Sequence, residues 1–558
     1  MRAGLLVVFA CGGSESIAPA GPAEPVTISI TATPCPEWRY ALVTDSFDPV
    51  EDLSRDALIA GWRDGSIAAA PETIEVLART LGPGAAQVTG RPDPTRRQRV
   101  VVSVDELSPA WKVVTIDGQH PLGADTHALV ARDCHRTTSN FDPAKLTTIV
   151  MSGTTALTRR TAERIESHGA ADLVQHIAPW FRSADITHVS NEVAFVRDCD
   201  PLEKAAGEHD DLVFCSKDKY IEALDLIGTD LVELTGSHLS DYGALPRTIE
   251  MYRKRGWVWF GGGRTQLEAT EPRILEHRGH RFAFLGCNAV GTWLHAVSTG
   301  YGVAACDWAR MTWQIRDLRE RGILPIVSVQ HQETHEHDVP PGVVVDLRRL
   351  AEAGAVFVLG SQAHSAHPWD VHHGAFVHYG PGNILFAQYV EAQREAAVDK
   401  LYFHAGKLLT VEHLYTRTEH GQPRLLTARE RQRFLGQMEK VANDLPPSAP
   451  WEPPTPGDGD PRVRPDSLIV QHGRMQQLAV RVPDKLEDRQ RYPLIVDLAG
   501  TSAHGARDSD AFVVTPLGKR RATGTEIATF ITAKYPVDPD RTSITPEPRT
   551  RKRRSGRR

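Results

Sequence analysis

The feature that most constrains the fold of this 558-residue chain is a regular alternation of apolar and amphipathic segments between Leu146 and Leu445. Short β-branched apolar runs such as LTTIVMSG, RFAFLGCN and ILPIVSV predict buried strands. The segments between them, such as TAERIESHG and MTWQIRDLRERG, have helical periodicity. Alternation of this kind predicts an α/β domain whose polar site residues gather at the carboxyl ends of strands.

The flanking segments divide the rest of the chain. Residues 25–145 mix short strands with helical patterns and predict an α/β accessory domain, which weakly resembles the solute-binding domains of surface lipoproteins. Residues 446–465 form a Pro-rich linker, residues 466–546 a further α/β piece and residues 547–558 a basic tail. The fold class expected is therefore α/β (α+β), with the central domain at residues 146–445.

Composition and the first residues indicate an exported chain that does not bind nucleic acid. The net charge is -6, and no basic stretch interleaved with aromatic residues suggests a nucleic-acid surface. The start, MRAGLLVVFACGG, resembles a bacterial lipobox, so residues 1–24 are interpreted as a lipoprotein-type signal and leader with lipidation at Cys11. This predicts membrane association through a lipid anchor on the outer face of the bacterial cell membrane. The alternative is a few apolar residues before an unstructured leader.

Cysteine usage agrees with export. Six cysteines remain besides Cys11, and an even set favours disulfides in an oxidising compartment. Nearness in sequence favours Cys199 with Cys215 and Cys287 with Cys306, which leaves Cys35 and Cys134 as the third pair. The alternative is six buried thiols in a cytosolic protein.

Polar side chains follow several predicted strands of the central domain. The short sequences concerned are GTT at Gly153, SNE at Ser190, TGSH at Thr235, QHQE at Gln330 and GSQAH at Gly360. Asn, Glu, His and Gln are residue types that ligate metals or bind phosphate and carboxylate groups. They form one site only if the fold brings these strand ends together.

The stretch VQHQETHEHD, residues 329–338, suggests zinc at first sight. His331 and His335 are four residues apart, but Gln332 stands where the metalloprotease pattern requires a glutamate. The stretch also follows a predicted strand, so its histidines do not lie on one helix face. We interpret His331, His335 and His337 as loop residues and Glu333 as a residue of the site.

An ordered series of motifs resembles one protein family. The motifs are ADITHVSNE, DLVELTGSHLSDYG, FGGG followed by EPRILEHRGHRFAFLGCN, and AGAVFVLGSQAH followed by GAFVHYGPGNILF. Together they resemble the CapA family, the bacterial capsule or poly-γ-glutamate synthesis proteins. The resemblance implies a metallophosphoesterase-like αββα sandwich with a metal site at the strand ends.

The resemblance also implies roles for particular residues. Glu192, Glu333 and His364 match positions of metal ligands, and His238 and Asp241 match the catalytic histidine and the acid that follows it. Further residues implied to line the site or bind substrate are Asn191, Ser237, Gln330, Thr154 and Asn383.

Several family positions are changed in this chain. Thr154 follows Gly153 where the family has an aspartate, and Ser237 replaces an asparagine. Gln330 and Ser361 each replace a histidine. The remaining carboxylates and imidazole suffice for one divalent metal ion, whereas a two-metal phosphoesterase centre needs more ligands.

Two functions follow as alternatives. The first is a CapA-like protein in capsule or poly-γ-glutamate synthesis, export or processing, acting as a metal-dependent hydrolase or transferase on an anionic surface polymer or its precursor. The second is a non-catalytic protein that binds such a polymer or serves as a scaffold in a capsule-synthesis complex. The retained ligands favour the first, and the four replaced positions favour the second.

The C-terminal piece poses a separate question. RYPLIVDLAGTSAHG and the strand and helix patterns after it resemble the opening of an esterase of the α/β-hydrolase fold. No nucleophile elbow G-x-S-x-G follows, and the chain instead reads PEPRTRKRRSGRR. We therefore expect residues 466–546 to lack hydrolase activity, and the Pro-rich linker predicts loose attachment to the central domain.

Overall fold

The protein is described from a computed structural model of the 558-residue chain. The residues described are 35–88, 98–123, 129–134, 136–201, 213–290, 294–296, 300–388, 390–446, 463–470, 474–481, 492–498, 511–517, 522–534 and 537–545. Cys11 and the basic tail, residues 547–558, lie outside these ranges, as does most of the Pro-rich linker.

An eight-stranded sheet forms one half of the central domain, in the order β13-β12-β9-β8-β23-β24-β25 with β22 paired to β8. The strands β8, β9, β12 and β13 run parallel, and β23, β24 and β25 add an antiparallel ribbon. The bounds are β8 Leu146–Thr155, β9 Ile186–Asn191, β12 Leu231–Glu233, β13 Val258–Phe260, β22 Asn383–Leu385, β23 Glu395–His404, β24 Lys407–Glu419 and β25 Gln422–Leu425.

A six-stranded sheet forms the other half, in the order β15-β16-β18-β19-β21-β20. Its four inner strands run parallel, and β15 and β20 are antiparallel edge strands. The bounds are β15 Arg273–His277, β16 His280–Asn288, β18 Leu324–Gln330, β19 Phe357–Gly360, β20 Trp369–His372 and β21 Ala375–His378.

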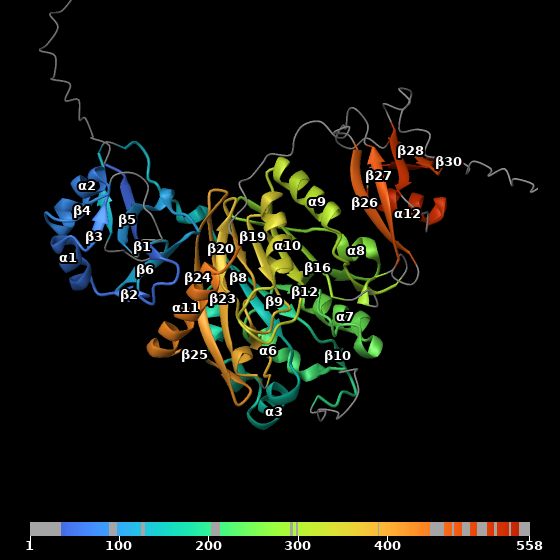
Figure 1. The fold of residues 1–558 in the computed structure, drawn as a ribbon, viewed down its shortest axis with the longest axis horizontal. Helices are drawn as coiled ribbons and strands as arrows, with labels where there is room; N and C mark the ends of the chain where they lie inside the picture. The colour runs from blue at the N-terminus through green and yellow to red at the C-terminus, as the bar shows by residue number, and fades with distance from the viewer. Residues whose placement is uncertain are drawn as a thin grey trace, which may run out of the picture.

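The two sheets pack face to face, with helices on both outer faces (Figure 1). One apolar core lies between the sheets and joins Met151 and Leu231 of the first to Phe284 and Ile326 of the second. The first sheet is covered by helices that include α3 (Arg159–His168), α6 (Glu222–Leu226) and α7 (Leu245–Arg255), and the second by α9 (Trp308–Glu320) and α10 (Pro341–Glu352). The predicted α/β class is confirmed, and the layers run helix, sheet, sheet, helix.

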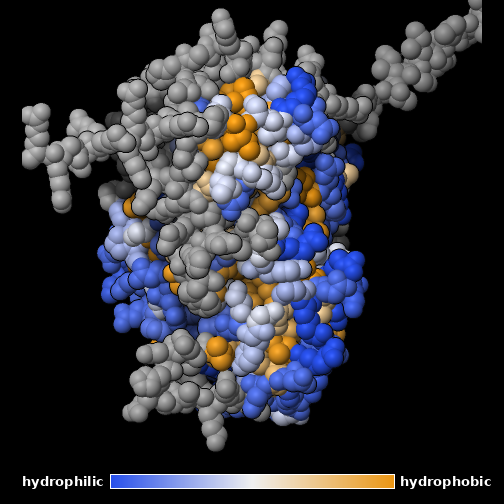
Figure 2. All heavy atoms as spheres, turned by 90° about the vertical axis from the view of Figure 1, so that its right-hand side faces the viewer, coloured by the Kyte–Doolittle hydropathy of each residue, from blue (hydrophilic) through white to orange (hydrophobic). Residues whose placement is uncertain are grey.

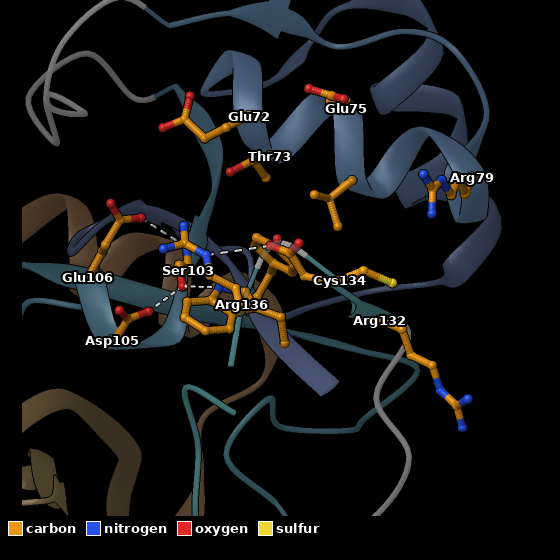
Figure 3. Close-up of a pocket in the computed structure, with 14 residues that line it drawn as sticks. Glu72, Thr73, Glu75, Arg79, Ser103, Asp105, Glu106, Arg132, Cys134 and Arg136 are labelled. Atoms are coloured by element: carbon orange, nitrogen blue, oxygen red, sulfur yellow. Dashed lines mark hydrogen bonds and ion pairs between the residues drawn. The ribbon is translucent and has the colours of Figure 1, made fainter. Parts of the chain in front are cut away.

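The N-terminal unit is a seven-stranded sheet with two helices on one face. It contains β1 (Glu37–Asp45), β5 (Arg99–Ser103) and β6 (Trp111–Ile116), with helices α1 (Arg55–Asp64) and α2 (Pro71–Leu81). Its other face packs against Tyr402 and Leu409 of the central ribbon. This unit has a cavity of about 560 Å³. It is lined by charged residues such as Glu72 and Arg136, which Figure 3 shows. Cys134 lines this cavity, whereas none of the residues predicted for the strand-end site does.

The C-terminal unit is a five-stranded sheet, β26-β27-β29-β28-β30, with one helix, α12. The bounds are β26 Val463–Val470, β27 Arg474–Arg481, β28 Tyr492–Asp497, β29 Phe512–Leu517, β30 Val537–Thr545 and α12 Gly524–Lys534. Trp313 of α9 packs against the small apolar core of this unit, so the unit contacts the central domain. Figure 2 shows the side of the molecule that carries the unit, where hydrophobic side chains lie in patches among hydrophilic ones.

All three predicted disulfides are present. Cys35–Cys134, Cys199–Cys215 and Cys287–Cys306 have Cα–Cα distances of 4.6, 5.8 and 4.9 Å. The bonds point to an extracytoplasmic location, because disulfides persist in oxidising compartments. Within the described ranges, no helix has both the length and the apolar character needed to cross a membrane.

Candidate functional site

The candidate site lies where the carboxyl ends of the two sheets meet. The side chain of Thr154, at the end of β8, donates to the Ser361 carbonyl just after β19 at 2.6 Å. Asn288, at the end of β16, donates through Nδ2 to the carbonyl of Thr235, which follows β12, at 2.7 Å. Because parallel strands present their carboxyl ends at one edge, the two facing sheets place all these loops together.

Three predicted metal ligands converge at this edge. His364 Nε2 lies 3.8 Å from Glu192 Oε1 and 4.0 Å from Glu333 Oε1. The side chains of Glu192 and His364 are 1% and 4% exposed, whereas that of Glu333 is 47% exposed, so the group opens to solvent on one side. His364 has a left-handed backbone conformation (φ 52°), which costs a residue with a side chain about 1–2 kcal/mol.

Neighbouring polar groups hold the two buried ligands. Ser237 Oγ donates to Glu192 Oε1 at 2.9 Å, and His364 Nδ1 lies 2.9 Å from Asn383 Oδ1. An amide oxygen accepts only, so Nδ1 of His364 carries a proton, and Nε2 is the ring nitrogen that faces the carboxylates. Gly236 is needed for this packing, because a Cβ there would lie 2.5 Å from Glu192 Cα.

His238 and Asp241 form a pair beside the carboxylates. His238 Nδ1 lies 2.9 Å from Asp241 Oδ2, and the backbone N–H of Phe214 also donates to Oδ2 at 2.8 Å. Burial acts to lower the pKa of His238, but the hydrogen bond to Asp241 and the charges of Glu192 and Glu333 raise it above its ordinary value. His238 therefore holds a proton more readily than a free histidine does.

Glu233, at the end of β12, is a buried carboxylate that the sequence motifs did not identify. Ser361 Oγ donates to its Oε1 at 2.8 Å, Ser328 Oγ donates to Oε2 at 2.5 Å, and Thr235 Oγ1 also donates to Oε1. Burial acts to raise its pKa, but His188, Ser328 and Thr235 lower it below the ordinary value. An acidic residue inside the apolar run TDLVELTG was the signal available in the sequence.

Three other predicted site residues make contacts with neighbouring strands and loops instead of the carboxylates. Thr154 bonds to the Ser361 carbonyl, as described above. Asn191 Nδ2 donates to Tyr252 Oη at 2.7 Å and to the Val193 carbonyl at 2.8 Å. Gln330 Oε1 accepts from Asn288 Nδ2 at 3.3 Å. These residues connect the strand ends around the site.

The stretch VQHQETHEHD runs from the end of β18 into an irregular loop, as predicted. His331 Nε2 lies 3.1 Å from Asp346 Oδ2, and His335 Nδ1 lies 2.9 Å from Gln393 Nε2. His337 Nδ1 lies 2.7 Å from the Ala366 carbonyl. Each histidine thus fixes the loop to a different segment, and Glu333 is the residue of this stretch that reaches His364.

The residue types at this end of the sheets are those of a divalent cation site, although the ligand atoms of Glu192, Glu333 and His364 do not all lie within 4.8 Å of one another. Glu192 Oε2 and Asn191 Oδ1 are buried oxygens with no hydrogen-bond partner among the described residues. A buried carboxylate oxygen without a partner is costly, and a bound cation would satisfy it. Two carboxylates and one imidazole are ligand types used by zinc and other divalent transition metals.

Comparison with known families decides the relationship of the central domain. Residues 148–388 match the family described as "Bacterial capsule synthesis protein PGA_cap". The central domain therefore belongs to the PGA_cap family. All of the residues discussed above from Thr154 to Asn383 fall within the matched segment of the PGA_cap domain.

Two curated relatives are similar to part of the chain. The capsule biosynthesis protein CapA of Bacillus anthracis is 20% identical over 302 residues, which cover 52% of this chain and 73% of that protein. The PGA biosynthesis protein CapA of Bacillus subtilis (strain 168) is 21% identical over 246 residues, covering 43% of this chain and 63% of that protein. None of these matches gives support for the esterase-like resemblance of the C-terminal piece, so that resemblance stays unsupported.

Solved structures of nucleotidases align with the chain at low scores. The NAD nucleotidase of Haemophilus influenzae is 11% identical with a TM-score of 0.30, covering 53% of this chain and 56% of that chain. The 5'-nucleotidase precursor of Thermus thermophilus is 13% identical with a TM-score of 0.28, covering 54% and 58%. At these scores the alignments carry no argument about the function of the PGA_cap protein.

Proposed function

We propose that this PGA_cap protein takes part in the synthesis, export or processing of an anionic surface polymer such as poly-γ-glutamate, as a metal-dependent hydrolase or transferase. One divalent ion would be held by Glu192, Glu333 and His364. The convergence of His364 Nε2 on Glu192 and Glu333 at 3.8 and 4.0 Å is the observation that carries the proposal. Family membership supports the polymer class.

Each residue of the site has a separate role in this proposal. An ion in this position would supply a Lewis acid and a positive charge for a phosphate or carboxylate oxygen of the substrate. His238, held by Asp241, would bind an anionic oxygen or give a proton to a leaving group. Asp241 would keep the ring oriented through the contact at Nδ1. Ser237 and Asn383 would hold the two buried ligands in place.

A second candidate is a polymer-binding or scaffolding protein without turnover. The hydrogen bonds of the replaced positions favour it: Thr154 Oγ1 donates to the Ser361 carbonyl, and Ser361 Oγ donates to Glu233. Hydroxyl groups used in this way do not replace the charged ligands of a second metal. In this reading the same edge would hold a polymer carboxylate or phosphate without cleaving it.

The experiment is to measure Mn²⁺ binding and activity on the purified full-length chain and two variants. Glu333→Gln removes a proposed ligand, and Glu336→Gln changes an exposed glutamate three residues along the same loop as the control. Titration calorimetry with Mn²⁺ gives affinity and stoichiometry, and release of shorter chains from poly-γ-glutamate or of phosphate from a phosphate ester gives activity.

The first function predicts one Mn²⁺ per chain at this site, with binding and activity lost together in Glu333→Gln and retained in Glu336→Gln. Polymer binding by the wild type without any turnover would select the scaffold instead. A wild-type chain that binds neither Mn²⁺ nor polymer at millimolar concentration would overturn both.

Attachment to the membrane through a lipid on Cys11 is a further part of the proposal. The three disulfides support an oxidising compartment, and the lipobox-like sequence VFAC at Val8–Cys11 supports lipidation. Such an anchor would place the central domain close to a growing surface polymer and to other members of a capsule-synthesis complex. Mass spectrometry of the membrane fraction from wild-type and Cys11→Ala cells tests it.

A further inference from the structure

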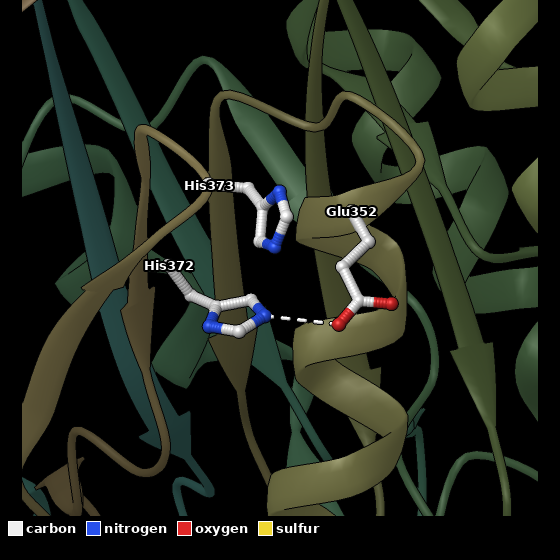
Figure 4. A group of neighbouring side chains, drawn as sticks. All are labelled: Glu352, His372 and His373. Carbon is white, nitrogen blue, oxygen red and sulfur yellow. Dashed lines mark hydrogen bonds and ion pairs between the residues drawn. The ribbon is translucent and has the colours of Figure 1, made fainter. Parts of the chain in front are cut away.

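We infer that Glu352, His372 and His373 form a second cation site, distinct from the strand-end site and selective for a transition ion such as Zn²⁺. One ligand atom from each residue lies within 4.8 Å of the others. Figure 4 shows the three side chains directed towards a common space, with His372 Nε2 3.0 Å from Glu352 Oε1.

The backbone explains how two consecutive histidines share one site. In a strand, successive side chains point to opposite faces, so a His-His pair would normally be split. His372 ends β20, and the turn of the β20–β21 hairpin is formed by His373 and Gly374, with φ of 51° and 80°. The left-handed turn breaks the alternation and places the ring centroids of His372 and His373 4.6 Å apart.

The third ligand comes from the end of a helix. Glu352 is the last residue of α10, where the helix dipole is negative and favours a cation. His372 is buried, whereas Glu352 and His373 are exposed and can adjust. The ligand atoms need to come together to about 3.4 Å for tetrahedral zinc with bonds of about 2.1 Å, and water can complete the shell.

This cluster lies at the opposite ends of the strands from the strand-end site. Phe376 of β21 pairs in register with Phe357, the first residue of β19, so the hairpin turn is at the amino-terminal edge. His364 follows the carboxyl end of β19. Two imidazoles and a carboxylate are donors that suit zinc, nickel and copper better than magnesium or calcium.

A matched control exists elsewhere in the chain. The turn between β24 and β25 is formed by His420 and Gly421, with φ of 48° and 83°, so it repeats the His-Gly turn at another place. His373→Asn and His420→Asn each remove an exposed imidazole, and asparagine tolerates the left-handed turn. Glu352→Gln removes the carboxylate charge without changing the size of the side chain.

The experiment is Zn²⁺ titration calorimetry and thermal unfolding on the tag-free full-length chain in the Glu333→Gln background, which disables the proposed strand-end site. We expect one Zn²⁺ per chain, bound at least tenfold more weakly after adding His373→Asn or Glu352→Gln and unchanged after adding His420→Asn. Zinc at about 100 times its Kd should raise the unfolding temperature by roughly 4 °C in the parent only.

Unchanged zinc affinity in both His373→Asn and Glu352→Gln would overturn the inference, as would equal weakening in His420→Asn. Unfolding in EDTA shows whether each variant is folded. The result is independent of the proposed function. If the strand-end site does not bind metal, the wild type will not bind Mn²⁺ there, but one Zn²⁺ per chain will still bind to Glu352, His372 and His373.

Discussion

Two glutamates at neighbouring strand ends of one sheet are equally buried, but they differ in the number of hydrogen bonds that their carboxylates accept. Glu233 follows β12's apolar residues and is 0% exposed, and Glu192 follows β9 and is 1% exposed. Three hydroxyl groups donate to Glu233, and His188 Nε2 lies 3.5 Å from its Oε2. Glu192 accepts from Ser237 at Oε1, and its Oε2 has no partner among the described residues.

The difference separates a carboxylate that holds the fold together from one prepared for a ligand. A buried charge is stable where hydrogen bonds and an opposite charge replace its water. Glu233 meets that condition through side chains from both sheets, so it connects the layers. Glu192 does not meet that condition, because its Oε2 has no hydrogen-bond partner among the described residues. His364 Nε2 lies 3.8 Å from its Oε1, and a cation bound between them would supply the missing interaction.

The largest effect is expected for Glu233→Ala. The change leaves three buried hydroxyls without their acceptor, removes the carboxylate 3.5 Å from His188 Nε2 and opens a cavity between the sheets. The free energy of unfolding should fall by about 4 kcal/mol, measured by urea unfolding of the full-length chain in EDTA. A loss below about 1 kcal/mol would show that Glu233 is not a structural carboxylate.

Glu192→Gln should act on metal binding instead. Without metal, the free energy of unfolding should stay the same or rise by up to about 1 kcal/mol, because an unsatisfied buried charge is removed. The affinity for Mn²⁺ should fall about 100-fold, which corresponds to about 2.7 kcal/mol. Calorimetry on the variant and on Glu336→Gln measures this. Equal affinity in both variants would contradict the assignment of Glu192 as a ligand.

The two glutamates should also differ in acid. The pKa of Glu233 is below its ordinary value because His188, Ser328 and Thr235 outweigh burial. A carboxyl group with a lowered pKa contributes stability above its unfolded pKa of about 4.3, and this stability is lost as pH falls through the folded pKa. The stability difference between wild type and Glu233→Gln should therefore shrink below about pH 4.3. A difference that grows on acidification would contradict the lowered pKa.

The sequence predicted the strand ends well and their side-chain contacts poorly. The apolar runs before Asn191, Gln330 and Ser361 locate β9, β18 and β19, since strand periodicity is a local property. Glu233 was missed because its role depends on hydroxyls from the facing sheet, which no local pattern contains. The same holds for His372, whose partner Glu352 is on a helix and whose neighbour turns back through a positive φ.

The smallest effects are expected from removing the serine that donates a hydrogen bond to each carboxylate. Ser361→Ala removes one of three hydroxyl donors to Glu233 and should cost about 1 kcal/mol whether or not Mn²⁺ is present. Ser237→Ala removes the donor to Glu192 and should also cost about 1 kcal/mol in EDTA. Saturating Mn²⁺ should reduce the cost of Ser237→Ala alone, because the ion then neutralises Glu192 directly. Urea unfolding of both variants with and without Mn²⁺ measures the four values. Equal costs of Ser237→Ala in the two conditions would mean that the ion does not reach Glu192, and the contrast between the two glutamates would then concern folding alone.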